Sequence, residues 1–365
     1  MVSGEKEVYK AVTPVIDSKG SRPLPVSPTG LDRPSMPSSS PDISVVIPHR
    51  NRADLLDCVI GSLRRQTVAA SEILVVDTGS IDASVERAEQ LGAKVLRLEP
   101  NAGFCRAVNC GVEASRSDLI AIVNNDVVLD AAWLEQIALA LQSPGTGFAT
   151  GKILSYDRGD LVDGTYDALS RGACAWRLGH GRSDGPAWSD RCPITFASLT
   201  AAAYRKELFL RVGGLDESFE MYLEDVDLGL RCAAAGCGGV YVPQAVARHR
   251  GSATMGVWHP DAVRRISRNQ LFLVAKHYPE HWIRDYGWPV FVGQALWGLV
   301  AARHGRGWSW LRGKWEAVRA FRRIRVSCTD TTGVREILDA SERQILDAQQ
   351  RAGFDLYWRL YFGLT

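Results

Sequence analysis

The chain has 365 residues, of which 46% are hydrophobic and 23% are charged, and its formal net charge is +2. This composition is typical of a globular protein and excludes a chain that is disordered throughout. So small a net charge leaves no basic excess to attract phosphates, so we expect no nucleic-acid partner.

The first 41 residues are rich in proline and serine. A segment of this kind buries too little apolar surface to offset the entropy that is lost on ordering. We therefore expect residues 1–41 to form a flexible arm, and we expect no signal peptide, because no apolar run follows the first lysines. No uncharged apolar run reaches the roughly 18 residues of a membrane-spanning helix, which favours a cytoplasmic protein.

Between residues 42 and 256, strand and helix patterns alternate. The β-branched run Ile43–Ile47 is typical of a buried parallel strand, and apolar residues follow it at helical spacing in 54–65. Further strands are expected at 72–76, 94–98, 119–123, 147–154 and 239–243, and further helices at 82–91, 105–114, 133–141, 206–212 and 228–235. This order predicts an α/β fold with a mostly parallel sheet. For residues 155–195 the sequence indicates only loops and short strands.

Four loops are expected at one edge of this sheet, at Pro48, Asp77, Asn101 and Asn124. Ligands of open α/β sheets bind outside the carboxyl ends of the strands, so these loops define one candidate crevice. Asp77 could accept a hydrogen bond from the imide N–H of a uracil or thymine ring, although an Asx turn is by itself the better explanation. No GxGxxG fingerprint or P-loop follows the first strand, which argues against dinucleotide binding and ATPase chemistry.

A divalent metal could bind in the same crevice. Asp126 follows a strand, and Mg²⁺ or Mn²⁺ often uses only one or two carboxylates together with the phosphates of a substrate. His249 could supply a second protein ligand, because imidazole suits Mn²⁺. The alternatives are a turn-capping aspartate at 126 and a hydrogen-bonded core histidine at 249.

Three carboxylates, those of Glu224, Asp225 and Asp227, lie within four residues and are bordered by apolar side chains. Carboxylates held against apolar walls tend to have raised pKa values, which suits a general base or acid. The alternative is the first turn of a helix, where acidic side chains are favoured by the macrodipole.

These motifs together resemble the family-2 glycosyltransferases, and most closely the rhamnosyltransferase-like branch, which extends lipid-linked or cell-wall polysaccharides. The resemblance covers about residues 43–256. It rests on these segments, in the order of the family: Val45–Pro48 with Asn51 and Arg52, Val75–Ser80 with Asp82, Asn101–Phe104, Asn124–Val127, Gly213–Asp216, Met221–Asp227, and Arg248–His249 with Gly251 and Ser252.

The resemblance implies a Rossmann-like GT-A domain over 42–256, a dTDP- or UDP-linked sugar donor, a divalent metal (Mg²⁺ or Mn²⁺) and inversion at the anomeric carbon. The acceptor would be a saccharide or a lipid-linked saccharide, and the transferred sugar could be rhamnose. Asp126 and His249 would bind the metal, and the base would be Asp225, with Glu224 as the second candidate. The donor would be held by Pro48, Arg50, Asn51, Asp77, Ser80, Asn101, Gly103, Asn109, Asn124 and Asn125.

The sequence departs from the family pattern at two places. Asn124 stands where the family has the first aspartate of its DxD motif, and His49–Arg50 stand where Thr-Tyr is more usual. These departures leave a second hypothesis open, a non-catalytic protein with a GT-A fold that binds nucleotide sugars or serves as a scaffold.

Residues 257–365 are expected to form a helical extension. Tryptophan and arginine are interleaved between 306 and 325, next to an apolar stretch, as in helices that lie in a membrane interface. The alternative is a helical subdomain that packs on the core or on a second subunit. We therefore expect 282–325 to contact either the inner face of the cell membrane or the other chain of a homodimer. Helices are predicted at 266–277, 288–303 and 333–352, followed by an exposed aromatic tail at 354–358.

Overall fold

The computed structural model describes residues 42–251, 258–325 and 331–365. The arm predicted at 1–41 lies outside these residues, and so does the boundary expected at 256. The described residues form one compact unit.

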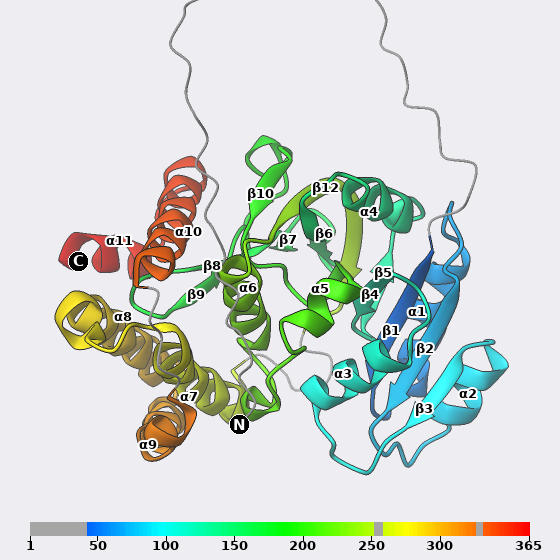
Figure 1. Ribbon diagram of the computed structural model, residues 1–365, viewed down its shortest axis with the longest axis horizontal. Coiled ribbons are helices and arrows are strands. Elements are labelled where there is room, and N and C mark those ends of the chain that lie inside the picture. Colours follow the sequence, from blue (N-terminus) through cyan, green and yellow to red (C-terminus); the bar gives the residue numbers. More distant parts are fainter. Residues whose placement is uncertain (1–41, 252–257, 326–330) are drawn as a thin grey trace, which may run out of the picture. The chain divides into compact units, whose positions relative to one another are not determined.

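A mixed sheet of ten strands forms the centre of this unit (Figure 1). Eight of the strands form one path, in the order β10 (Cys192–Ile194), β12 (Gly238–His249), β6 (Thr146–Ser155), β11 (Ala201–Arg205), β4 (Leu119–Val123), β1 (Ile43–His49), β2 (Glu72–Asp77) and β3 (Lys94–Arg97). Along this path, β1, β2, β3 and β4 are parallel to one another, whereas β11 runs antiparallel between β4 and β6. Off this path, β5 (Val127–Leu129) pairs with β12 and β7 (Val162–Gly164) with β6, while β8 (Asp167–Leu169) and β9 (Ala175–Arg177) form a separate antiparallel pair.

Helices cover both faces of the sheet because its strands are apolar on both sides. Along β1, Val45 and Ile47 belong to the hydrophobic cluster on one face, which includes buried residues of α1 (Ala53–Arg64) and α4 (Trp133–Leu141). Val46 belongs to the hydrophobic cluster on the other face, which includes buried residues of α3 (Phe104–Ala114) and α6 (Glu224–Ala234). This alternation follows from the period of two in a strand. The helices of this part are α1 (Ala53–Arg64), α2 (Ser84–Gln90), α3 (Phe104–Ala114), α4 (Trp133–Leu141), α5 (Lys206–Arg211) and α6 (Glu224–Ala234), with short 3₁₀ turns at Pro186–Trp188 and Glu217–Phe219.

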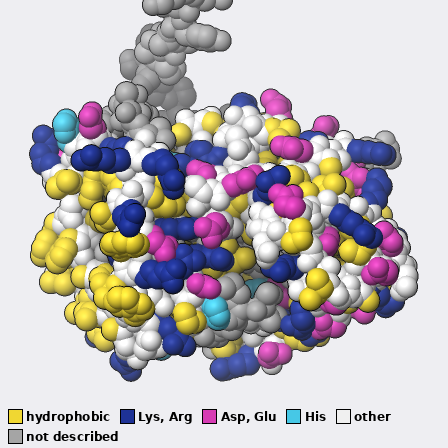
Figure 2. Space-filling model, turned by 90° about the horizontal axis from the view of Figure 1, so that it is seen from below, with side chains coloured by type: hydrophobic (Ala, Val, Ile, Leu, Met, Phe, Trp, Pro, Cys, Tyr) yellow, Lys and Arg dark blue, Asp and Glu magenta, His cyan; other side chains and the backbone are white. Residues whose placement is uncertain are grey.

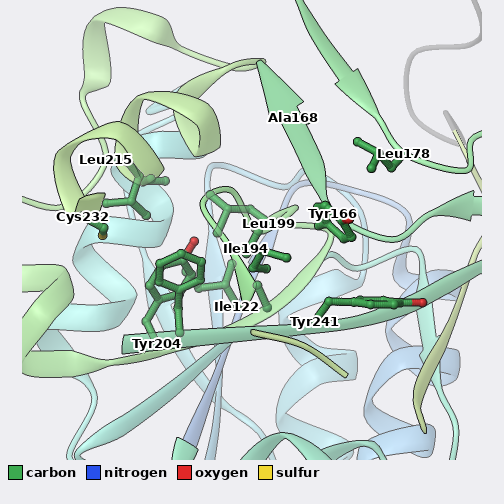
Figure 3. Packing of buried hydrophobic residues seen from close by; sticks show 14 of the residues in the cluster. Ile122, Tyr166, Ala168, Leu178, Ile194, Leu199, Tyr204, Leu215, Cys232 and Tyr241 are labelled. Carbon is green, nitrogen blue, oxygen red and sulfur yellow. The ribbon is translucent and has the colours of Figure 1, made fainter. Parts of the chain in front are cut away.

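The face of the sheet that α3 and α6 cover carries large aromatic side chains. Figure 3 shows Tyr204 of β11 and Tyr241 of β12 on this face, together with Ile122 of β4. Tyr204 stacks on Phe148 with ring centroids 5.2 Å apart. The same cluster includes Cys232 of α6, so the helix that begins with the acidic residues is packed against the sheet.

The C-terminal part is helical, as the sequence predicts for 257–365. It comprises α7 (Pro260–His277), α8 (Trp282–Arg303), α9 (Gly307–Ile324), α10 (Thr331–Ala352) and α11 (Leu356–Leu364). α9 lies close against α7, because a Cβ on Gly313 would come within 2.2 Å of the carbonyl oxygen of Arg264. Among the described helices, none is long and apolar enough to cross a membrane.

The prediction of an exposed aromatic tail at 354–358 is wrong. The end of the chain forms α11, in which Trp358 and Tyr361 are buried. Tyr361 donates a hydrogen bond to Glu342 of α10 and accepts one from the backbone N–H of Gly172. This burial could not be read from the sequence, because it depends on contacts with Trp176 and Gly172, which lie far away along the chain.

Candidate active site

The loops that follow β1 and β2 meet at the carboxyl edge of the sheet. The backbone N–H of Asn51 donates to the hydroxyl of Ser80 (2.7 Å), and the side-chain oxygen of Asn51 accepts from the N–H of Ile81 (3.0 Å). The guanidinium of Arg50 donates to the side chain of Asn101. These contacts bring together the loops at Pro48, Asp77 and Asn101, as the sequence predicts.

Asp77 is buried and turned back onto its own loop. It accepts hydrogen bonds from the backbone N–H groups of Gly79 and Ser80 (3.1 Å each) and from the Ser80 hydroxyl. These are the contacts of an Asx turn. Nearby, Gly103 precedes α3 with a φ of 87°, a conformation that glycine adopts without strain, and it is exposed at the same edge.

His49 at the end of β1 is a neutral histidine. Asn125 donates its side-chain N–H to Nδ1 (2.9 Å), so the ring proton lies on Nε2 and points to the hydroxyl of Ser84 (2.9 Å). Burial lowers the pKa of His49 to about 4, although Asp77 and Asp82 oppose this change. His49 thus ties the loop after β4 to the start of α2 and carries no charge at neutral pH.

The candidate metal ligands Asp126 and His249 face each other. Nε2 of His249 lies 3.3 Å from Oδ1 of Asp126, and Nδ1 lies 2.9 Å from Oδ2 of Asp163 on β7. Burial lowers the pKa of His249, but the bonds to Asp126 and Asp163 outweigh it and raise the pKa to about 9. Within the described residues, no group of three or more His, Cys, Asp or Glu side chains is arranged to hold a metal.

The acidic residues open α6, so the helix-start interpretation of this stretch is correct. They are also buried, with exposed fractions of 6% for Glu224 and 8% for Asp225. Burial and, after it, the neighbouring carboxyl group of Asp167 raise the pKa of Asp225, whereas Arg177 and the N–H of Val226 lower it, and the resulting pKa is about 7. Burial and the charge of Asp225 raise the pKa of Glu224 well above its usual range, and Oε2 of Glu224 has no hydrogen-bond partner among the described residues.

Arg177 connects the two groups of carboxylates. It stands opposite Asp167 in the β8–β9 pair, with Nε 3.3 Å from Oδ1 of Asp167 and Nη1 3.9 Å from Oδ2 of Asp163. The stem of Arg177 crosses Gly164, where a Cβ would come within 2.3 Å of Cδ. A continuous series of contacts therefore runs from His249 through Asp163, Arg177 and Asp167 to Asp225.

Asp227 has a different environment from its two neighbours. Its carboxylate is fully buried and is paired with Arg231 (2.7 Å), Lys276 (2.6 Å) and His277 (2.8 Å). The hydrogen bond from His277 and these cations lower its pKa despite burial. Asp227 therefore joins α6 to α7.

α7 also holds the loop in front of α6. The side-chain N–H groups of Asn269 donate to the carbonyl oxygens of Phe219 (2.9 Å), Met221 (3.0 Å) and Tyr222 (2.7 Å). Arg268 pairs with Glu220 (2.7 Å). The C-terminal helices thus support the segment that leads into Glu224 and Asp225.

Asn109 and Asn124, which the sequence assigns to donor binding, have side chains that are bonded within the protein or partly buried. Asn109 forms two hydrogen bonds with the backbone of Leu215, at 2.8 and 2.9 Å, and so supports the chain after Gly213–Gly214. The side-chain oxygen of Asn124 is buried without a hydrogen-bond partner among the described residues.

Three charged residues of this region were not predicted from the sequence, namely Asp163, Asp167 and Arg177. All three lie in 155–195, where short strands carry no periodic signal. Aspartates beside apolar residues in Val162–Gly164 and Asp167–Leu169 were the available hint.

Comparison with known proteins indicates the same family as the sequence motifs. Residues 44–213 match the model of glycosyl transferase family 2. The pre-mycofactocin glycosyltransferase of Mycobacterium tuberculosis is 30% identical over 230 residues, which cover 62% of this chain and 46% of that protein. The N-acetylglucosaminyl-diphospho-decaprenol L-rhamnosyltransferase of the same species is 26% identical over 230 residues, covering 55% of this chain and 73% of that protein.

A solved structure supports the fold. The crystal structure of GalNAc-T7 with UDP, GalNAc and Mn²⁺ superposes with a TM-score of 0.60 at 13% identity, covering 87% of this chain and 59% of that one. The expected α/β GT-A fold is therefore confirmed. The matches cover only 26%, 18% and 46% of three curated relatives, so this chain spans less than half the length of these proteins.

Proposed function

We propose that the chain, whose residues 44–213 match the model of glycosyl transferase family 2, transfers a sugar from a nucleotide-diphosphate donor to a hydroxyl group of a saccharide or a lipid-linked saccharide. The observation that supports this proposal best is the series of contacts from the Asp126–His249 pair to the buried carboxyl group of Asp225. It joins a place for the donor diphosphate to a place for a base.

The donor would lie at the carboxyl edge of β1, β2 and β4. Arg50, Asn101 and Gly103 are exposed there, next to the Asn51–Ser80 contact. The nucleotide sugar would also contact Pro48, Asp77 and Asn125, which belong to the same loops.

Asp126 and His249 fit a Mg²⁺ or Mn²⁺ ion that takes its remaining ligands from the diphosphate. A pKa of about 9 keeps His249 protonated at neutral pH, so a metal would displace the proton on Nε2 when it binds. Carboxylate oxygen and the resulting neutral imidazole are suitable ligands, and Asp163 would accept the Nδ1–H of His249, as carboxylates commonly do for metal-bound histidines. When bound, the metal would neutralise charge on the leaving diphosphate.

Asp225 would act as the base. Its pKa of about 7 lets the carboxylate accept a proton near neutral pH. Burial and the charge of Asp225 also raise the pKa of Glu224 well above its usual range, and Glu224 is the second candidate. The acceptor hydroxyl would give its proton to Asp225 while its oxygen attacks the anomeric carbon. The bond to the nucleoside diphosphate would break on the opposite side, which inverts the configuration.

Transfer assays with purified chain, Mn²⁺ and a panel of nucleotide sugars test this proposal. dTDP-rhamnose is the first donor to examine, because one curated relative is named a rhamnosyltransferase. We expect release of nucleoside diphosphate that depends on an acceptor and is lost in Asp225→Asn. Donor binding by both wild type and Asp225→Asn, without turnover for any donor and acceptor, would contradict the proposal.

Such a result would support the second candidate, a non-catalytic protein that binds nucleotide sugars. The observation in its favour is Asn124, which supplies a neutral amide where the family has a carboxylate. Calorimetry with nucleoside diphosphates, with and without Mn²⁺, would then report binding alone.

A further inference from the structure

Exposed apolar side chains are concentrated on the C-terminal helices. Of the fourteen large hydrophobic residues that are exposed in the described part of the chain, eleven lie on α8, α9 and α11. Figure 2 shows apolar side chains gathered on one side of the molecule, with arginines and lysines between them. Isolated exposed apolar residues are ordinary, but a cluster of this kind marks an interaction surface.

The clearest part of this cluster is a stripe along α9. Trp308, Leu311, Trp315 and Val318 follow one another at helical spacing, and their exposed fractions range from 49% to 79%. The fold does not need this stripe, because α9 packs on α7 through the opposite face, at Gly313 and Ala317.

α8 and α11 extend the apolar surface. Trp288, Phe291 and Leu299 are exposed on α8, and Leu360 and Leu364 are exposed on α11. The indole N–H of Trp288 donates to the carbonyl oxygen of Leu364 (2.7 Å), so the two helices lie side by side. α8 also lies beside α9, since a Cβ on Gly298 would come within 2.8 Å of the Trp310 ring.

Arginines border the stripe on α9. Arg319 lies over the ring of Trp315, with 4.4 Å from its guanidinium carbon to the ring centroid. Arg322 and Arg323 are exposed and have no ion-pair partner among the described residues. Glu316, the one acidic residue within α9, is already paired with Arg264 and Arg312. The surface is therefore apolar and positively charged at the same time.

We propose that the exposed faces of α8, α9 and α11 dock on an anionic lipid bilayer. Trp, Phe and Leu side chains enter the headgroup region, and Arg319, Arg322 and Arg323 contact lipid phosphates. α9 lies along the bilayer surface. A symmetric dimer fits this surface less well, because a twofold axis at α9 would bring the same arginines of two chains together.

The position of this surface relative to the candidate active site adds to the proposal. α9 is bonded to α7 through Arg264–Glu316 (2.6 Å) and through Lys314, which donates to the carbonyl oxygen of Ser267 (2.7 Å). The neighbouring residues Arg268 and Asn269 hold the loop in front of Asp225. α7 therefore links the docking surface on α9 to the loop that leads into Asp225, an arrangement that suits an acceptor held in the bilayer by a lipid. This last point rests on the proposed function, whereas docking itself does not.

Co-sedimentation of the full chain with vesicles tests the proposal. We expect binding to vesicles of phosphatidylcholine and phosphatidylglycerol at low salt, weaker binding at high salt, and little binding to phosphatidylcholine alone. Arg319→Gln/Arg322→Gln/Arg323→Gln should weaken binding on the order of 100-fold, since each arginine near an anionic surface contributes about 1 kcal/mol. The matched control is Arg97→Gln/Arg116→Gln/Arg343→Gln, which removes the same charge from exposed sites elsewhere and should bind almost as wild type.

A second pair of variants tests the apolar stripe. Leu311→Ser/Val318→Ser should lose most of the binding, whereas Leu210→Ser/Ile81→Ser, which changes exposed apolar residues outside the surface, should keep it. Absence of binding to anionic vesicles at low salt would overturn the proposal, and so would equal binding by the two arginine variants. A stable dimer in light scattering that Leu311→Ser/Val318→Ser dissociates would also overturn it, because a second copy would then cover the surface. These measurements need no sugar transfer, so their outcome is separate from that of the proposed function.

Discussion

The imidazole of His249 is held between two carboxylates, with Nδ1 2.9 Å from Asp163 and Nε2 3.3 Å from Asp126. Asp163 lies on β7 and Asp126 in the turn after β4. Asp163 accepts the hydrogen bond from Nδ1–H, so the proton that a metal would displace is the one on Nε2, next to Asp126. Asp163 is thus placed to orient a metal ligand without binding the metal itself.

Replacement of Asp163 should therefore weaken metal binding. In Asp163→Asn the orienting negative charge is lost, and we expect the affinity for Mn²⁺ to fall about 10–100-fold. Titration of the protein with Mn²⁺, followed by electron paramagnetic resonance of the free ion, measures this without a turnover assay. Asp157→Asn, at an exposed site six residues earlier, should bind Mn²⁺ as wild type. Equal affinities for the two variants would remove Asp163 from the metal site.

Transfer should depend on the ionisation of Asp225. Its pKa is raised to about 7, so the active, deprotonated base becomes more abundant as pH rises through this value. We expect kcat/KM to rise across pH 6–8 in wild type, whereas Asp225→Asn should be lower by roughly 10²–10⁴-fold, without this rise. A wild-type rate in Asp225→Asn would exclude it as the base.

The same raised pKa predicts an effect on stability. Between the ordinary value of 3.8 and about 7, the native state binds a proton that the unfolded state has released, so the free energy of unfolding falls as pH rises. Asp225→Asn lacks this ionisation. Its gain in stability over wild type should therefore be larger at pH 8 than at pH 5 in urea unfolding. A gain that does not change with pH would contradict the raised pKa.

Asp227 should behave in the opposite way. Asp227→Asn leaves Arg231, Lys276 and Nε2 of His277 without their common carboxylate partner, and we expect a loss of about 3–5 kcal/mol in the free energy of unfolding. The pKa of Asp227 is lowered, so its contribution is present above about pH 4 and is lost as pH falls further. Asp57→Asn, which breaks an exposed pair with Arg87, should cost at most about 1 kcal/mol.

The parallel part of the fold could be predicted from the sequence because its signals are local. The strand in Ile43–His49 and the helix in Trp133–Leu141 have clear apolar patterns, and the structure places both within two residues of the predicted limits. The antiparallel strand β11 was not foreseen, because the direction of a strand depends on partners that are distant in sequence. α11 was not foreseen either, because its contact with Gly172 joins residues that are distant in sequence.

The candidate site could be predicted only in part. Residues at strand ends, such as Asp126, follow from the rule that ligands bind at the carboxyl edge. Asp167 and Arg177 escaped prediction because their contact depends on the register of the β8–β9 pair, which joins residues ten positions apart. For the acidic stretch, the helix start is confirmed and the carboxylates are buried as well, while the role of Asp225 as the base stays a prediction. Only the structure separates Asp225 from the ion-paired Asp227.

The loop in front of α6 has an unusual backbone that depends on α7. Glu220, Tyr222 and Leu223 have φ values of 61°, 71° and 66°, which are uncommon for residues other than glycine and need support from the surroundings. Asn269 provides this support through three hydrogen bonds to backbone carbonyl groups. In Asn269→Ala the loop is free to relax, and the position of the acceptor beside Asp225 should become less favourable.

We expect kcat/KM for the acceptor to fall about tenfold in Asn269→Ala, which corresponds to roughly 1.4 kcal/mol. The affinity for the nucleoside diphosphate, measured by calorimetry with Mn²⁺, should stay unchanged, because the donor loops lie at the edge of β1, β2 and β4. The matched control is Gln294→Ala, which removes a buried amide of α8 that donates to Gly172 (2.8 Å) and not to this loop. Gln294→Ala should lower the free energy of unfolding while kcat/KM for the acceptor stays near the wild-type value. An equal loss of kcat/KM in both variants would mean that Asn269 acts through general stability and does not position the acceptor loop.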